Sequence, residues 1–230
     1  QQIAWIALGT VISLVIMLLN TKFLRQITPY LYVFGLALMV LPLIFYSSEL
    51  VSSTGAKNWV TIGHVTLFQP SEFMKIAIVD ALARVTKEHN DYYLIHTTES
   101  ELQYIWKCMK VVVPPALLVL LQNDTGVVLI ILVGAAFVIF SSGLRNQWFI
   151  FGLSLVAVIL IIGAYLFIYQ PEIFEKLLSS HQVDRFYGWL DPEGTYNKEG
   201  FQLFNSLLSY GSAGWFGHGF QSVIKVFPEA

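Results

Sequence analysis

The sequence predicts an all-α polytopic membrane protein with about six transmembrane helices and a long polar tract after them. Of its 230 residues, 56% are hydrophobic and 12% are charged, and the mean hydropathy is +0.64. So few charges cannot cover a water-facing globule of this length. Uncharged runs at 1–21, 26–48, 125–144 and 146–171 each reach the ~20 residues that a spanning helix requires. The net charge of −2, without a basic stripe, predicts no nucleic-acid partner.

The transmembrane region is predicted to occupy residues 1–169. Its spans are expected at about 3–19, 30–46, 70–85, 107–121, 126–142 and 148–169. Four of these lie in the uncharged runs, and the span at 107–121 begins with basic side chains that can extend to the membrane surface. In the span at 70–85, residues 73–85 are apolar apart from Lys75, Asp80 and Arg84. Because Asp80 and Arg84 are four residues apart on one helix face, we expect them to neutralise each other.

Lysine and arginine gather in alternate loops, which predicts the orientation of the chain. By the positive-inside rule, loops rich in these residues are cytoplasmic. The cytoplasmic side is assigned Lys22, Arg25, Arg84, Lys87, Lys107, Lys110 and Arg145. The short loops of the opposite side hold only Lys57 and Lys75. The 47–69 loop, the turn at 122–125 and the tract at 170–230 are therefore expected to face outward.

Two acidic strings, at 69–73 and 122–126, stand where predicted outer loops meet spans. Each has an ordinary explanation as a helix start, because Glu72 suits the positive end of a helix dipole and Asp124 can cap the helix after it. The alternative is a polar cavity at the membrane surface, since ionisable residues at membrane depth are commonly functional. Glu72, Lys75 and Asp124 would then line that cavity. The residues alone leave both explanations open.

Three other features predict less. The single Cys108 excludes an internal disulfide and is expected to pack as a small apolar side chain. The glycine-rich run at 211–219 lacks the Lys of a Walker motif, so nucleotide binding is not expected. His218, in the same run, has no partner at metal-ligand spacing.

Taken in order, several strings resemble the signatures of a known family along essentially the whole chain. They are Gly55–Trp59, Gln69–Phe73, Gln122-x-Asp124-x-Gly126, Ser142–Arg145, Leu190–Glu193 and a glycine-rich stretch that ends in Pro228-Glu229-Ala230. Together they look like the SEDS proteins (shape, elongation, division and sporulation). The string at 55–59 looks more like the RodA elongation branch than the FtsW division branch. Two positions depart from the family pattern, since Asn123 stands where Pro is usual and His218 where Lys is common.

The resemblance implies a membrane glycosyltransferase of about ten helices that polymerises lipid II into glycan strands outside the bacterial cytoplasmic membrane. This chain would cover roughly the second to seventh helices, and 170–230 would be part of a large, truncated extracellular loop. In the family the Asp identified as catalytic follows the Pro-Glu-Ala string. That Asp is expected beyond Ala230, so no catalytic residue is expected in this chain and the fragment is expected to be inactive. The implied partners are lipid II, a class B penicillin-binding protein and other proteins of cell-wall elongation or division.

The resemblance and the outward placement together give a set of substrate-binding or cavity-lining candidates. They are Lys57, Trp59, Glu72, Lys75, Asp124, Arg185 and Lys225. The cations, or a divalent ion such as Mg²⁺ or Mn²⁺ with unknown ligands, would offset charge on a leaving pyrophosphate. Two other functions stay open. A flippase for lipid-linked precursors would be favoured by inverted repeats, and a noncatalytic scaffold of a synthase complex would be favoured if the chain's continuation lacked an Asp.

Overall fold

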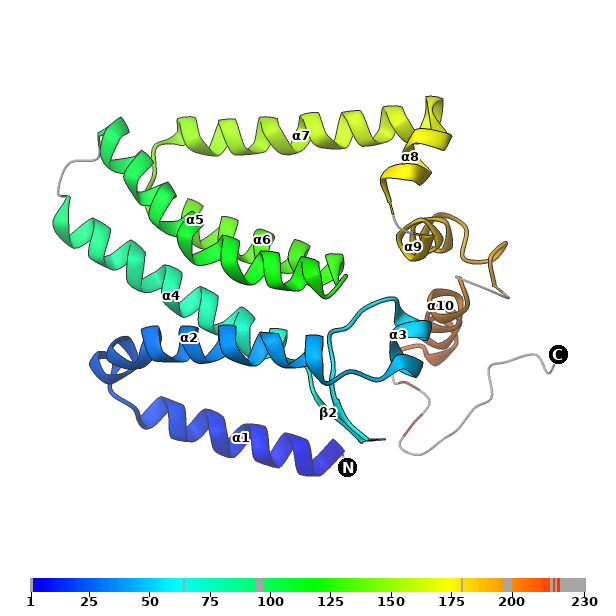
Figure 1. Ribbon diagram of the computed structural model, residues 1–230, viewed down its shortest axis with the longest axis horizontal. Coiled ribbons are helices and arrows are strands. Elements are labelled where there is room, and N and C mark those ends of the chain that lie inside the picture. The colour runs from blue at the N-terminus through cyan, green and yellow to red at the C-terminus, as the bar shows by residue number, and fades with distance from the viewer. Residues whose placement is uncertain are drawn as a thin grey trace. The chain divides into compact units, whose positions relative to one another are not determined.

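The computed structural model describes residues 2–63, 65–93, 97–178, 180–196, 200–215, 217 and 219, in two compact units, 1–152 and 153–230. The long helices are α1 (Gln2–Leu18), α2 (Thr21–Ile44), α4 (Pro70–Tyr92), α5 (Thr98–Leu121), α6 (Thr125–Phe140) and α7 (Asn146–Tyr169) (Figure 1). Each predicted span overlaps one of these helices, but α2 and α5 begin well before their predicted spans and α4 ends well after its span. The all-α prediction is therefore confirmed, while the passage of each helix through the membrane stays a prediction.

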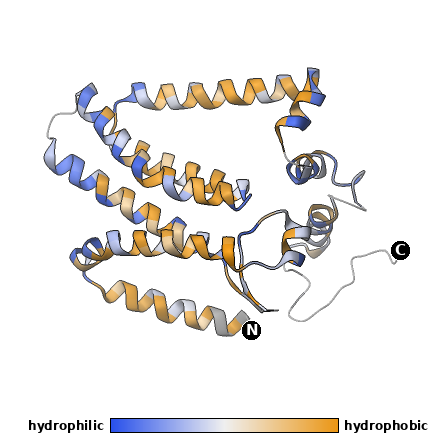
Figure 2. Cartoon of the chain, in the orientation of Figure 1, coloured by the Kyte–Doolittle hydropathy of each residue, from blue (hydrophilic) through white to orange (hydrophobic). Residues whose placement is uncertain are grey.

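The apolar character of these helices is that of an integral membrane protein. By length and composition, α2, α5 and α7 can each cross a membrane, and α1 and α6 contain shorter apolar stretches. Figure 2 shows hydrophobic residues along most of α1, α2, α6 and α7, with hydrophilic residues toward the start of α5 and the end of α4. No residue of α7 is buried in the described structure, so its apolar surface is available to lipid or to other helices.

Side-chain caps set the starts of the helices in the first unit. Asn20 accepts a hydrogen bond from the backbone N–H of Lys22 at the start of α2. Thr97 and Ser100 form a reciprocal capping box at the start of α5. Pro70 stands in the first turn of α4, where its missing N–H costs nothing. These local signals explain why the helices begin where they do.

The core of the first unit lies where α2, α4, α5 and α6 pack together. Met39, Met74, Tyr104 and Val119 are fully buried there, and Cys108 packs among them as expected. Helices α2 and α4 approach closely at Gly35, where an added Cβ would lie 2.7 Å from the Met74 sulfur. A small residue at such a contact is typical of helix packing in membranes.

The predicted outer loop at 47–69 has regular structure of its own. It contains α3 (Ser48–Thr54) and an antiparallel hairpin of β1 (Val60–Ile62) and β2 (Val65–Phe68). The backbone N–H of Thr61 donates to the carbonyl of Phe45 at 3.0 Å, which ties the hairpin to the end of α2. The sequence did not predict this hairpin, because its strands of three and four residues are too short to show alternation.

Among its described residues, the second unit contains three short helices within the predicted extracellular loop. They are α8 (Pro171–Leu177), α9 (Ser180–Leu190) and α10 (Phe201–Ala213). An aromatic cluster joins the end of α7 to α8 and α9, with the ring of Phe167 5.4 Å from that of Phe174 and 5.0 Å from that of Phe186. Desolvation and a hydrogen bond to the Glu175 carboxylate raise the pKa of the Tyr187 hydroxyl. Aromatic contacts thus hold α8 and α9 against the end of α7.

Candidate functional site

Asp124 is the centre of a polar cluster where the 47–69 loop meets the turn between α5 and α6. One carboxylate oxygen, Oδ1, accepts from the backbone N–H of Val127 at 3.2 Å and so caps α6, as the sequence predicted. The other, Oδ2, accepts from the side-chain amides of Asn58 at 2.6 Å and Gln69 at 3.3 Å. The half-buried carboxylate therefore joins the loop, the start of α4 and the start of α6.

Gln122 fixes the same turn from within the core. Its buried side-chain amide donates to the backbone carbonyl of Met39 in α2 at 2.7 Å. The backbone carbonyl of Gln122 accepts from the backbone N–H of Lys57 at 2.8 Å. We name Lys57, Asn58, Gln69, Gln122 and Asp124 the Asp124 cluster. It brings together two of the residues predicted from the sequence, Lys57 and Asp124. Sequence reasoning missed Asn58, Gln69 and Gln122 as individual residues, although all three lie in the strings that carried the resemblance.

Polar atoms with unused hydrogen-bonding capacity lie in this region. The buried atoms Asn58 Oδ1 and Ser71 Oγ have no hydrogen-bond partner among the described residues. Groups of this kind usually bind water or a ligand, because leaving them unpaired costs free energy. Nearby, the Lys57 ammonium lies 4.5 Å from the centre of the Tyr46 ring, and Trp59 is 39% exposed. The cluster can therefore present a cation, an aromatic face and amide groups to a polar ligand.

Glu72 and Lys75 form an ion pair on α4, with Lys75 Nζ 2.9 Å from Glu72 Oε1. The Glu72 side chain is 60% exposed and that of Lys75 is 25% exposed. The backbone N–H of Glu72 donates to the carbonyl of Gln69, so the pair begins one turn from the Asp124 cluster. A partly exposed pair of this kind contributes only ~0–1 kcal/mol to stability, so these two charges can serve another role.

The last two candidates lie elsewhere. Arg185 is exposed on α9 in the second unit. Lys225, the other candidate, lies outside the described residues, as does His218, which was not a candidate. Among the residues that are described, no group of three or more His, Cys, Asp or Glu side chains is placed to hold a metal ion.

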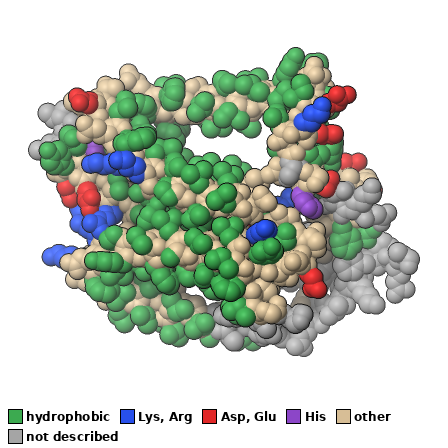
Figure 3. Space-filling model, viewed as in Figure 1, with side chains coloured by type: hydrophobic (Ala, Val, Ile, Leu, Met, Phe, Trp, Pro, Cys, Tyr) green, Lys and Arg blue, Asp and Glu red, His purple; other side chains and the backbone are tan. Residues whose placement is uncertain are grey.

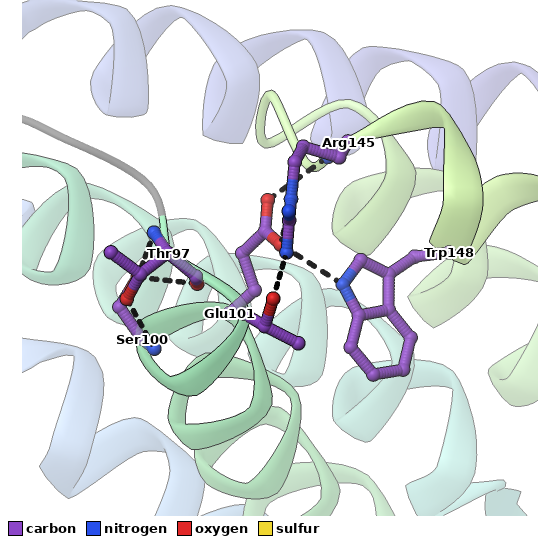
Figure 4. Close-up of polar contacts among 6 residues, drawn as sticks. Thr97, Ser100, Glu101, Arg145 and Trp148 are labelled. Carbon is purple, nitrogen blue, oxygen red and sulfur yellow. Dashed lines mark hydrogen bonds and ion pairs between the residues drawn. The ribbon is translucent and has the colours of Figure 1, made fainter.

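The opposite end of the first unit holds a buried charge network that the sequence did not predict. Glu101 is fully buried, and its carboxylate accepts from Arg145 Nε at 2.7 Å, from the Arg145 backbone N–H at 3.1 Å and from Trp148 Nε1 at 3.1 Å (Figure 4). Arg145 also donates to the Thr98 hydroxyl at 2.6 Å. The network fastens the turn before α7 to the start of α5. Its sequence signal was Arg145 alone, because Glu101 lies 44 positions away.

The expected pairing of Asp80 with Arg84 is wrong. Asp80 Oδ2 accepts instead from the hydroxyl of Thr28 on α2 at 2.5 Å. Arg84 Nε pairs with Glu88 at 2.7 Å, and its Nη1 donates to the carbonyl of Arg25 at 3.1 Å. The two residues have the spacing that an ion pair on one helix requires. However, Asp80 binds a residue of α2, and Arg84 binds a residue of α2 and one in the next turn of α4.

Comparisons with known proteins give matches over the whole chain. Residues 1–230 match the profile of the FtsW, RodA and SpoVE family, described as cell cycle proteins. Peptidoglycan glycosyltransferase MrdB of Escherichia coli K12 is 30% identical over 233 residues, covering all of this chain and 57% of MrdB. A probable peptidoglycan glycosyltransferase FtsW of Aromatoleum aromaticum is 28% identical over 98% of this chain and 51% of its own length. This chain therefore spans little more than half of these relatives.

A solved structure has the same fold. The description of that structure concerns the structural coordination of polymerization and crosslinking by a peptidoglycan synthase complex. Its matching chain superposes with a TM-score of 0.63 and 23% identity. The match covers 94% of this chain and 56% of that one.

Proposed function

This chain belongs to the FtsW, RodA and SpoVE family of cell cycle proteins, and from that premise we propose that the full-length protein is a peptidoglycan glycosyltransferase. Its reaction would be the polymerisation of lipid II into glycan strands at the outer face of the cytoplasmic membrane, in the RodA-like elongation branch. The observation that supports this most is the alignment of the whole chain with a relative named for that activity.

The Asp124 cluster and the Glu72–Lys75 pair are proposed to bind the polar head of the lipid-linked substrate. In glycosyl transfer, the acceptor sugar's hydroxyl oxygen bonds to the anomeric carbon while the bond from that carbon to the pyrophosphate breaks. A carboxylate base takes the hydroxyl proton, and the lipid pyrophosphate leaves. Lys57 and Lys75 would offset charge that develops on the pyrophosphate, and Trp59 would contact a sugar. Arg185 and Lys225 are proposed to add positive charge from the loop.

Cofactor and partners belong to the same proposal. A divalent cation, Mg²⁺ or Mn²⁺, is proposed as a cofactor of the full-length protein, and titration with EDTA followed by readdition of each metal tests it. A class B penicillin-binding protein is proposed as the transpeptidase partner, together with other cell-wall elongation or division proteins. Co-purification of the two full-length proteins from membranes, with a detergent-only control, tests that association.

The decisive experiment is incubation of purified full-length protein with lipid II, scored for glycan chains by gel electrophoresis. We expect glycan chains from the wild type, and a loss of about tenfold or more in Glu72→Ala and Asp124→Ala. Lys107→Ala, an exposed change on α5 outside both groups, is the control. No glycan from the wild type would overturn the proposal. Movement of lipid II across vesicle membranes without polymer would support the transporter alternative instead.

A further inference from the structure

Charged side chains gather at the end of the first unit where α2 begins and α4 ends (Figure 3). A cavity of about 240 Å³ lies here between the two helices, and Arg25, Arg84 and Lys87 contribute to its lining. This end is also the one that the positive-inside rule assigns to the cytoplasm. None of the three cations belongs to the Asp124 cluster or to the Glu72–Lys75 pair.

Two contacts hold cations at the cavity while leaving them able to bind an anion. Arg84 Nη1 donates to the carbonyl of Arg25, which places both guanidinium-bearing residues at one site. Arg84 pairs with Glu88, whose side chain is 58% exposed. Such exposed pairs are worth only ~0–1 kcal/mol, so a phosphate can replace the carboxylate. Arg25 has no ion pair with any described residue.

Lys87 adds a third cation under a similar weak restraint. Its ammonium lies 3.4 Å from Asp91, whose side chain is 64% exposed. The acid among the described lining residues is Asp80, which lies one turn before Arg84 on α4 and accepts a hydrogen bond from the hydroxyl of Thr28. The Asp80 carboxylate is thus engaged across the α2–α4 contact, and the remaining N–H groups of Arg84 stay available to a ligand.

We propose that this cavity binds the phosphate headgroup of an anionic phospholipid from the adjacent leaflet. Basic pockets between membrane helices on the cytoplasmic side suit such headgroups, and guanidinium groups bind phosphate through paired hydrogen bonds. The volume of about 240 Å³ is below the ~300–1,000 Å³ of ordinary small-molecule pockets, which favours a headgroup over a whole cofactor. The proposal is independent of the polymerase reaction, because it uses the opposite end of the unit.

Native mass spectrometry of the purified full-length protein tests the site. The probes are phosphatidylglycerol and phosphatidylcholine with identical acyl chains. The double variant Arg25→Gln/Arg84→Gln removes two cavity cations, and Lys22→Gln/Lys107→Gln removes two exposed cations that do not line the cavity. We expect the cavity variant to lose roughly thirtyfold in phosphatidylglycerol affinity, from about a fivefold effect for each of the two cations, with the control within about threefold.

Each other outcome has a fixed meaning. Equal losses in the two double variants, or equal retention of both lipids by the wild type, would overturn the proposal. Displacement of phosphatidylglycerol by an equal concentration of inorganic phosphate would overturn the lipid assignment and indicate a free-anion site. If the double variant does not fold, Lys87→Gln alone carries the test, because its exposed contact with Asp91 contributes little to stability. We expect it to weaken phosphatidylglycerol binding about fivefold, and unchanged binding would refute the site.

Discussion

Asp124 Oδ2 accepts a hydrogen bond from Asn58 Nδ2 at 2.6 Å across 66 positions of sequence. This contact connects the hairpin loop to the cap of α6 and places Lys57 and Trp59 beside the turn. The acid that the sequence singled out is therefore both a helix cap and the anchor of the outer loop. The two explanations left open by the sequence, capping and a polar cavity wall, are compatible in one side chain.

Replacing Asp124 should separate its structural contribution from its chemical one. We expect Asp124→Ala to lower the free energy of unfolding by about 2–3 kcal/mol, because it loses a cap worth ~1 kcal/mol and charge-assisted bonds to two amides. Asp124→Asn keeps an acceptor and a capping residue, so a loss of about 1 kcal/mol is expected. Thermal unfolding of the full-length protein in detergent measures both.

A double-mutant cycle with Asn58→Ala checks that the contact itself is responsible. We expect a coupling energy of at least about 0.5 kcal/mol between Asn58→Ala and Asp124→Ala. Strictly additive losses would mean that the two side chains do not interact in the membrane-embedded protein.

The Glu72–Lys75 pair should affect activity and not stability. Because Glu72 is mostly exposed and Lys75 is partly exposed, Glu72→Gln and Lys75→Gln should each change the free energy of unfolding by less than about 1 kcal/mol. If these charges contact the lipid-linked substrate, polymerisation of lipid II should fall about tenfold or more. Asp91→Asn, an exposed change near the other end of α4, is the matched control. Full polymerisation by both variants would remove the pair from the site.

The buried network around Glu101 predicts an unequal response of its two partners. Arg145→Ala leaves a fully buried carboxylate with Trp148 Nε1 and one backbone N–H, and we expect a loss of about 3 kcal/mol. Glu101→Gln keeps a polar side chain of the same shape beside an arginine whose side chain is 40% exposed, so about 1–2 kcal/mol is expected. Resistance of the full-length protein to proteolysis during heating ranks the variants. The reverse order would mean that the Glu101 carboxylate is not buried within the membrane-embedded protein.

Sequence patterns located the helices well because the uncharged runs are long and the caps are local. Pro70 and Asp124 marked the starts of α4 and α6 within a single turn of chain. The partners across space could not be found in the same way. The contact of Glu101 with Arg145 joins residues 44 positions apart, and that of Thr28 with Asp80 joins residues 52 positions apart. Only the packing of the folded chain brings these side chains together. The hairpin was missed because its strands are too short for a periodic signal.

Asn123 supplies a test of the turn that carries Asp124. Its φ is +60°, a left-handed conformation that a proline ring cannot adopt, although Pro is usual at this position in the family that the sequence resembles. Its backbone N–H also donates to the carbonyl of Leu120 at 3.0 Å. We therefore expect Asn123→Pro to cost about 3 kcal/mol or more in unfolding free energy, although it restores the family residue.

Two companion variants make the test of this turn specific. Asn123→Gly should be neutral or stabilising by up to about 1 kcal/mol, because glycine adopts positive φ without steric cost. Asn123→Ala should cost about 1 kcal/mol, because its Cβ is strained in the left-handed region. Thermal unfolding of the full-length protein should therefore rank the variants Gly, Ala and Pro in decreasing stability. A proline variant as stable as the wild type would mean that the turn has negative φ, and the contacts of Asp124 with Asn58 and Gln69 would then have to differ.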